Sequence, residues 1–149
     1  MNEDKVYLNY MQFQACNDCK KQNAANPYNY HHMSQQDKRI ANMLFGSVYP
    51  LYLIKVEKKG RTKKELDEVI AWLTGYDAVE LDKLIETRVN FEDFFDKAKL
   101  TPQFHLITGM ICGYRIEAID NPLTRKVRAL DKLVDELAKG RKMEKIMRK

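Results

Sequence analysis

The stretch "DNPLTRKVRALDKLVDELAKG", residues 120–140, is the segment of the sequence that decides the fold class. Asp120 or Asn121 can cap the start of a helix, and Pro122 suits the first helical position because its missing N–H costs nothing there. Gly140 is placed where a helix ends. Between these signals, apolar residues recur every three or four positions, at Leu123, Val127, Leu130, Val134 and Leu137. This period predicts a long amphipathic helix with one face in a core.

Two segments that precede this one in the chain contain the same kind of helix-start signal in a more complete form. In "TKKELDEVIAWLTG", residues 62–75, Thr62 and Glu65 can form a capping box, and Gly75 can end the helix. In "DAVELDKLIETR", residues 77–88, Asp77 and Glu80 repeat the box. Both segments are therefore predicted to be short helices. The apolar side chains expected in the core are Leu66, Val69, Ile70 and Leu73 in the first, and Val79, Leu81, Leu84 and Ile85 in the second.

Two further helices are predicted on either side of this pair. Ser47 is the expected N-cap of "SVYPLYLIKVEKKG", residues 47–60, with Pro50 tolerated in its first turn and Gly60 at its end. Asn90 is the expected start of "NFEDFFDKAKL", residues 90–100, in which the three phenylalanines share one face. The sequence therefore reads as helices separated by short connections.

Residues 101–119, "TPQFHLITGMICGYRIEAI", fit two patterns. Ile107, Met110, Ile111 and Tyr114 have helical spacing, whereas Leu106, Thr108, Met110 and Cys112 alternate as in a strand. We predict a helix, in which Gly109 and Gly113 lie on one face and allow close approach, and keep the strand as the alternative.

These segments predict an all-α protein, a compact orthogonal bundle of about five to seven helices. Residues 34–149 are expected to form a single helical domain, since domains most often span roughly 100–150 residues. Residues 1–33 differ from the rest because they are rich in Asn, Gln and Tyr and show no helical period. We expect them to be a flexible arm, or a mis-annotated leader if the natural start is Met33.

The composition excludes several classes of protein. The chain is 44% hydrophobic and 32% charged, which is ordinary for a globular protein. No apolar run approaches the roughly 18 residues of a membrane span, and the first residues do not resemble a secretory signal. The odd number of cysteines argues against a secreted disulfide framework. We therefore expect a cytoplasmic protein without a membrane partner.

The sequence offers one weak candidate for a metal site. Cys16 and Cys19 have the spacing of one half of a structural zinc site. The other half is poor, because His31 and His32 are adjacent and their side chains diverge. We therefore predict neither a metal nor a cofactor.

The basic C-terminus is a candidate nucleic-acid surface. Residues 121–149 contain ten Lys and Arg against four Asp and Glu, whereas residues 61–100 are acidic. The helical pair at residues 65–86 has the spacing of a helix-turn-helix, but its second helix carries too many carboxylates to approach phosphates. A nucleic-acid role is the less favoured alternative, and the residues that would carry it are Lys139, Arg141, Lys142, Lys145 and Arg148.

An enzyme would need groups that converge, and the sequence contains no recognised catalytic motif. Cys112, Arg115 and His105 are the candidates for a small catalytic pocket. We favour binding over catalysis, through a protein partner or self-association, on a surface around residues 109–115. The candidate ligand-binding or partner-binding residues are Tyr49, Tyr52, Trp72, Cys112 and Arg115.

Three stretches together resemble a known family. They are "FGSVYPLYLIKVEKKGRTKKELDEVIAWLTGY" (residues 45–76), "FEDFF" (91–95) and "LITGMICGYRIEAIDNPLTRKVRALDKLVDELAKGRKMEKIMRK" (106–149). The chain from about Arg39 to Lys149 is similar to the bacterial domain-of-unknown-function family numbered 2200. The resemblance implies a small, mainly helical domain that begins near residues 36–39, and it implies no activity, cofactor or catalytic residue.

Overall fold

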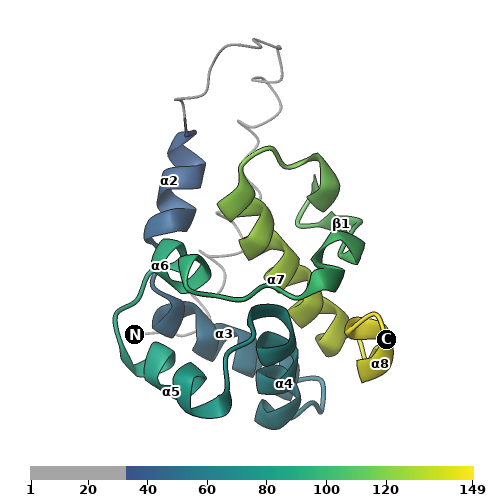
Figure 1. Ribbon diagram of the computed structural model, residues 1–149. Coiled ribbons are helices and arrows are strands. Elements are labelled where there is room, and N and C mark those ends of the chain that lie inside the picture. The colour runs from purple at the N-terminus through teal and green to yellow at the C-terminus, as the bar shows by residue number, and fades with distance from the viewer. Residues whose placement is uncertain (1–32) are drawn as a thin grey trace.

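The computed structural model describes residues 33–149 and shows a mainly helical fold (Figure 1). Residues 1–32 lie outside the described part, and with them the predicted arm and the residues Cys16, Cys19, His31 and His32. The helices are α2 (Gln35–Asn42), α3 (Phe45–Glu57), α4 (Lys63–Thr74), α5 (Ala78–Glu86), α6 (Phe91–Asp96), α7 (Pro122–Ala138) and α8 (Met143–Ile146). Two 3-10 turns, η2 (Pro102–Leu106) and η3 (Ile116–Ala118), flank the strands β1 (Met110–Ile111) and β2 (Tyr114–Arg115). The all-α prediction is confirmed.

Helix α7 runs through the middle of the fold and packs against α2, α3, α4, α6, α8, β1 and η3 (Figure 1). Its predicted apolar stripe is in the core, with Val127, Leu130, Val134 and Leu137 at most 2% exposed. Because neighbours cover it on several sides, polar residues of α7 are buried as well. These are Thr124, Arg128, Asp131 and Glu136.

The predicted start signals are largely correct. Thr62 and Asp77 each accept a hydrogen bond from the backbone N–H three residues on, and Glu65 and Glu80 complete the two capping boxes. Asn90 and Asn121 cap α6 and α7 through their side chains. Gly75 ends α4 in a left-handed conformation with φ of 73°. One burial prediction is wrong, because Val79 of α5 is 62% exposed.

Helix α3 begins at Phe45, three residues earlier than the predicted N-cap at Ser47 implies, and Ser47 is not its cap. Leu44 takes the N-cap position without a side-chain hydrogen bond, and Pro50 lies inside the helix. The reason is tertiary: Leu44 pairs with Asn90 in an isolated β-bridge, and the Phe45 N–H donates to the carbonyl of Val89. Contacts with a distant part of the chain therefore set the start of this helix.

The core contains an aromatic cluster that joins α3 to α6. Phe45 stacks on Phe94 with ring centroids 4.1 Å apart, and Phe91 and Phe95 extend the cluster. All four rings are at most 2% exposed. The phenylalanines of residues 90–100 were predicted to share one face, and all three are buried together.

Residues 101–119 do not form the predicted helix. Strands β1 and β2 pair antiparallel, with Met110 opposite Arg115 and Ile111 opposite Tyr114. The two residues between the strands, Cys112 and Gly113, have φ of 50° and 81°. Positive φ at both central positions is what a tight two-residue hairpin turn requires, and it is incompatible with a right-handed helix. The alternative reading as a strand was closer, although it placed Cys112 in a strand rather than in the turn.

No helix among residues 33–149 has both the length and the apolar character needed to cross a bilayer.

Candidate functional site

The hairpin and its flanking turns, residues 102–118, are called the hairpin segment below. Hydrogen bonds fix it to itself and to α7. Lys132 Nζ of α7 donates to the Met110 carbonyl at 3.0 Å, and the Gly109 N–H donates to the Glu117 carboxylate at 2.9 Å. The Ile116 N–H donates to the Gly109 carbonyl at 3.0 Å, and the Ile116 side chain is fully buried. The hairpin segment is thus a braced part of the fold.

A buried polar cluster lies between α3, α7 and the hairpin segment. The Tyr52 hydroxyl donates to Asp131 Oδ1 at 2.5 Å, and Arg128 Nη1 lies 3.5 Å from Asp131 Oδ2. The Arg128 guanidinium also lies 5.1 Å from the centroid of the Tyr114 ring, within cation–π range. Arg128, Asp131 and Tyr52 are at most 5% exposed. Buried charges require such partners, and these interactions hold α3, α7 and the hairpin segment together.

Cys112 lies at the edge of this cluster. Burial raises the pKa of its thiol, the charge of Asp131 raises it further, and the charge of Arg128 opposes the rise. A thiol with a raised pKa is protonated at neutral pH, and the thiolate is the nucleophilic form. Cys112 is therefore a poor nucleophile.

We expect Cys112 in the folded chain to react with iodoacetamide at pH 8 several-fold more slowly than in urea-unfolded chain, because the folded thiol is less ionised and less accessible. Mass spectrometry of the Cys112 peptide measures this rate separately from those of Cys16 and Cys19. Equal rates in the folded and unfolded chains would contradict the assignment of Cys112 as an inert thiol.

The five candidate binding residues are not on one surface. Tyr49 and Tyr52 are each 3% exposed, and the Tyr49 hydroxyl donates to Asp67. Burial and that hydrogen bond raise the pKa of Tyr49 well above its ordinary value. Trp72 is half-buried against the core. Only Cys112 and Arg115 belong to the hairpin segment, so the predicted aromatic contribution of Tyr49 and Tyr52 to a binding surface is wrong: both are packed inside.

The three residues of the enzyme alternative bind different groups. His105 is exposed, and its Nδ1 lies 2.8 Å from the Pro102 carbonyl. Arg115 pairs with Glu117 at 3.2 Å. Neither contact involves Cys112, so these contacts do not assemble a catalytic set.

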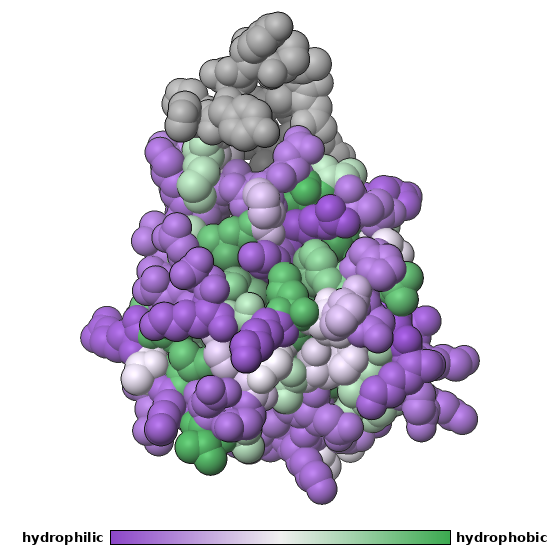
Figure 2. All heavy atoms as spheres, viewed as in Figure 1, coloured by the Kyte–Doolittle hydropathy of each residue, from purple (hydrophilic) through white to green (hydrophobic). Residues whose placement is uncertain are grey.

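The hairpin segment also exposes two large apolar side chains that the sequence did not single out. Leu106 is 45% exposed and Met110 is 50% exposed. Of the other exposed large hydrophobic residues among residues 33–149, Met33 precedes α2 and Val79 lies in α5. Figure 2 shows that the viewed face is largely hydrophilic, with hydrophobic residues in its middle and at its edges. The signal for Leu106 and Met110 was missed because a helical reading places Met110 on the buried face.

The basic residues of the C-terminus are largely occupied within the fold. Arg141 and Arg148 both pair with the buried carboxylate of Glu136, at 2.8 and 2.7 Å. Lys139 pairs with Asp135 at 2.8 Å. Of the five residues predicted for nucleic acid, only Lys142 and Lys145 form no ion pair within residues 33–149. Three of the five predicted side chains are therefore engaged within the fold, while the net positive charge of residues 121–149 is unchanged.

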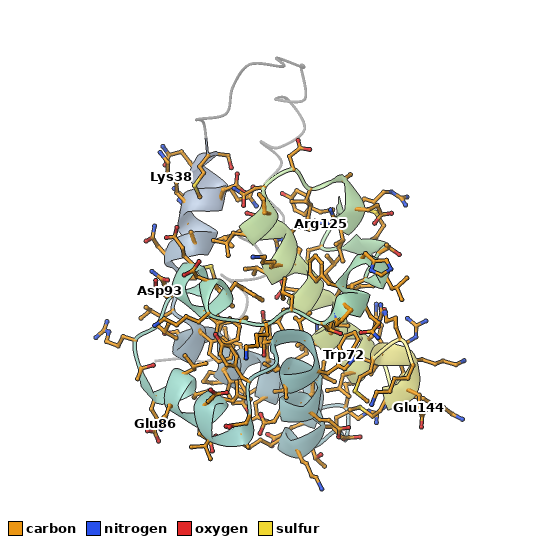
Figure 3. The ribbon with its side chains drawn as sticks, in the orientation of Figure 1. Lys38, Trp72, Glu86, Asp93, Arg125 and Glu144 are labelled. Carbon is orange, nitrogen blue, oxygen red and sulfur yellow. The ribbon has the colours of Figure 1, made fainter. Side chains whose placement is uncertain are left out.

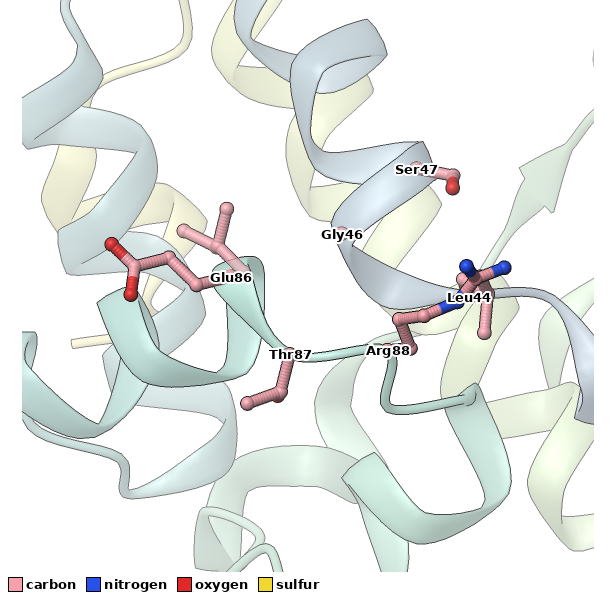
Figure 4. Close-up of a pocket in the computed structure, with 7 residues that line it drawn as sticks. Leu44, Gly46, Ser47, Glu86, Thr87 and Arg88 are labelled. Carbon is pink, nitrogen blue, oxygen red and sulfur yellow. The ribbon is translucent and has the colours of Figure 1, made fainter.

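A shallow, open depression of about 350 Å³ lies where the start of α3 meets the end of α5 (Figure 4). It is lined by Leu44, Gly46, Ser47, Ile85, Glu86, Thr87 and Arg88. Glu86 and Arg88 bring opposite charges to its wall, and no acid–base pair or metal-ligand set lines it. The described residues contain no group of three or more His, Cys, Asp or Glu that could hold a metal ion.

Comparisons with known proteins find one family and a similar solved structure, and neither carries an activity. The family model described as "Uncharacterized protein conserved in bacteria (DUF2200)" matches residues 39–148. The crystal structure of the uncharacterized protein SP1917 is similar, with 41% sequence identity and a TM-score of 0.70, over 79% of this chain and 95% of that chain. No curated protein matches. Any assignment of function must therefore come from the surface of the molecule.

Proposed function

Because the chain belongs to the DUF2200 family of uncharacterized proteins conserved in bacteria, whose description carries no activity, we propose a function from its surface: a helical module that binds a protein partner through the hairpin segment. The observation that carries the proposal is the exposure of Leu106 and Met110, at 45% and 50%, on one braced segment. Single exposed apolar residues are ordinary, whereas neighbouring ones often belong to contact surfaces.

Bracing matters because a rigid surface loses little conformational entropy when it binds. The Met110 carbonyl is held by Lys132, and its strand neighbour Ile111 is 6% exposed. Ile107, next to Leu106, is 1% exposed. Each exposed side chain thus sits beside a buried anchor that fixes its position.

Binding accounts for the site better than catalysis does. The thiol of Cys112 has a raised pKa, and His105 and Arg115 are engaged with Pro102 and Glu117. These groups brace the hairpin segment or lie on its surface. A contact surface needs that rigidity and needs no activated group.

Photo-cross-linking inside the bacterial host tests the proposal. A benzoylphenylalanine is placed at position 106 or 110 of the full chain, and the adducts are identified by mass spectrometry. The matched control is position 79, because Val79 is comparably exposed on α5. We expect positions 106 and 110 to trap the same protein in a defined adduct, and position 79 to trap none.

Adducts at position 79 equal to those at 106 and 110 would contradict the proposal, as would the absence of any adduct at both hairpin positions. An adduct with a second copy of the chain from both hairpin positions would identify the partner as the chain itself.

A further inference from the structure

We infer that the partner bound by the hairpin segment is a negatively charged protein segment in an extended conformation, because two cations of α7 without carboxylate partners lie at the two ends of the exposed apolar pair. The cations are Arg125 and Lys132. This inference rests on the proposed function, and it adds the chemistry of the partner.

Lys132 lies at the Met110 end of the hairpin segment. Its ammonium donates to the Met110 carbonyl at 3.0 Å and would lie 3.8 Å from a Cβ added at Gly109. A carbonyl is a neutral acceptor, so this bond positions the ammonium without cancelling its charge. Lys132 forms no ion pair with any residue in the range 33–149, and two of its three N–H donors remain available.

Arg125 lies at the Phe104 end, on the upper part of α7 in Figure 3. Its guanidinium carbon lies 6.0 Å from the centroid of the Phe104 ring. Its Nε is buried and has no hydrogen-bond partner, and the residue forms no ion pair within the described part of the chain. A buried donor without an acceptor is uncommon, and a bound water or ion is one of its ordinary explanations.

The spacing of the two cations fits an extended chain. Residues seven apart on a helix lie on nearly the same side, about 10.5 Å apart along the axis. An extended chain rises about 3.3 Å per residue and alternates its side chains between two faces, so two carboxylates four residues apart lie on one face and span about 13 Å, within reach of the long, flexible side chains of Arg125 and Lys132. The stretch from Phe104 to Met110 runs from one cation to the other, with Leu106 between them. The side chain midway between the two carboxylates of such a partner lies on the same face and would therefore meet Leu106 and Met110.

Carboxylates near this surface are already engaged. Glu117 accepts from the Gly109 N–H and pairs with Arg115. Asp131 accepts from Tyr52 and Arg128. The charge of Arg125 and Lys132 is therefore left for a ligand.

A protein segment fits this surface better than a nucleic acid does. Single-stranded nucleic acids bind on exposed aromatic side chains, on which their bases stack. The exposed large hydrophobic residues between Met33 and Lys149 are Met33, Val79, Leu106 and Met110, and none is aromatic. Leucine and methionine next to cations suit acidic peptides that also carry apolar residues.

Fluorescence polarisation of the full chain with a labelled peptide tests the inference. The probe is a nine-residue peptide with the central sequence Glu-Leu-Leu-Leu-Glu, and its control has Gln in place of both Glu. At low salt we expect saturable binding of the Glu peptide and binding of the Gln peptide at least tenfold weaker. We expect Arg125→Gln and Lys132→Gln each to weaken binding of the Glu peptide at least fivefold. The matched control Lys142→Gln, at an exposed lysine without an ion pair in residues 33–149, should leave binding unchanged.

Arg125→Gln is the decisive variant, because the Arg125 side chain makes no hydrogen bond within residues 33–149 and its loss should leave the fold intact. Thermal unfolding checks that both variants fold. Equal binding of the Glu and Gln peptides, no binding of either, or no effect of Arg125→Gln in a folded protein would overturn the inference. Stronger binding of a ten-nucleotide single-stranded DNA than of the peptide would overturn it in favour of nucleic acid.

The failure of this inference is distinguishable from that of the proposed function. Cross-linked adducts at positions 106 and 110 that persist unchanged in the Arg125→Gln variant would leave the contact surface standing while removing the preference for negative charge.

Discussion

Replacing Glu136 with alanine is expected to lower the free energy of unfolding by about 3 kcal/mol, because breaking a buried charge pair leaves its partner unpaired. The Glu136 carboxylate is 6% exposed, and Arg148, its main partner, is 13% exposed. Arg148 donates two hydrogen bonds to it, at 2.7 and 3.1 Å, and Arg141 adds a third at 2.8 Å. Arg141 is 48% exposed, so solvent screens its ion pair with Glu136 and reduces the contribution of that pair to stability.

The same substitution should release the C-terminal segment, residues 141–149, from α7. Arg61 also holds this segment, through its bond to the Arg141 carbonyl at 2.6 Å. We therefore expect local loosening at the C-terminus and faster cleavage by trypsin after Lys142 or Lys145 than in the unchanged chain. Urea unfolding measures the stability, and limited proteolysis measures the release.

Glu144→Ala is the matched control, because Glu144 is exposed on α8 and forms no ion pair with residues 33–149. It should change the free energy of unfolding by less than about 0.5 kcal/mol. If Glu136→Ala proved as mild as Glu144→Ala, the C-terminal arginines would not be structural, and their assignment away from nucleic acid would lose its support.

Gly46→Ala is expected to lower the free energy of unfolding by about 2 kcal/mol, within the usual range for overpacking. A Cβ at Gly46 would lie 2.3 Å from the carbonyl oxygen of Ile85, which belongs to the backbone of α5 and cannot move as a side chain does. Helix propensity alone gives the opposite sign, because alanine is favoured over glycine inside a helix by roughly 1 kcal/mol. The sign of the change in the free energy of unfolding therefore shows whether the clash with Ile85 or the helix propensity of alanine dominates.

Ser47→Ala is the control for Gly46→Ala, because Ser47 is exposed on the next position of α3 and caps nothing. We expect it to be neutral or slightly stabilising in the same urea titration. A Gly46→Ala protein more stable than the unchanged chain would show that α3 and α5 are not in close contact at this point.

Local signals predicted most of the helices correctly, because each signal consists of a few residues that are close together in the sequence. Thr62 with Glu65 and Asp77 with Glu80 are complete capping boxes, and Asn121 with Pro122 starts α7 as expected. These residues act on backbone groups within three positions. Such signals can therefore be recognised in the sequence without knowledge of contacts between distant residues.

The errors arose where distant contacts decide the structure. The start of α3 depends on the pairing of Leu44 with Asn90, which no local pattern shows. In the hairpin segment, the spacing of the apolar residues suited a helix, but the chain turns at Cys112 and Gly113. The sequence signal for a two-residue hairpin turn is a residue that tolerates positive φ, such as Asn or Asp, followed by Gly. Here Gly113 occupies the second position, but Cys112 is an uncommon residue at the first.

The candidate site was predictable only in part. The sequence pointed to residues 109–115, and this stretch forms the hairpin, with Met110, Gly113 and Arg115 exposed and Ile111 buried. Tyr49 and Tyr52 were misplaced because the carboxylates that bind their hydroxyls, Asp67 and Asp131, are far along the chain. The basic C-terminus was overvalued as a nucleic-acid surface for the same reason. Arg141 and Arg148 pair with Glu136, whose burial depends on the packing of the whole fold.

Chemical-shift mapping tests most directly the claim that the hairpin segment is the contact surface and favours negative charge. The 15N-labelled full chain is titrated with the Glu-Leu-Leu-Leu-Glu peptide, and the amide shifts are followed. We predict that the changes concentrate in residues 104–115 and 125–132. Changes concentrated instead at residues 142–149, or around the depression at residues 44–47 and 86–88, would contradict it.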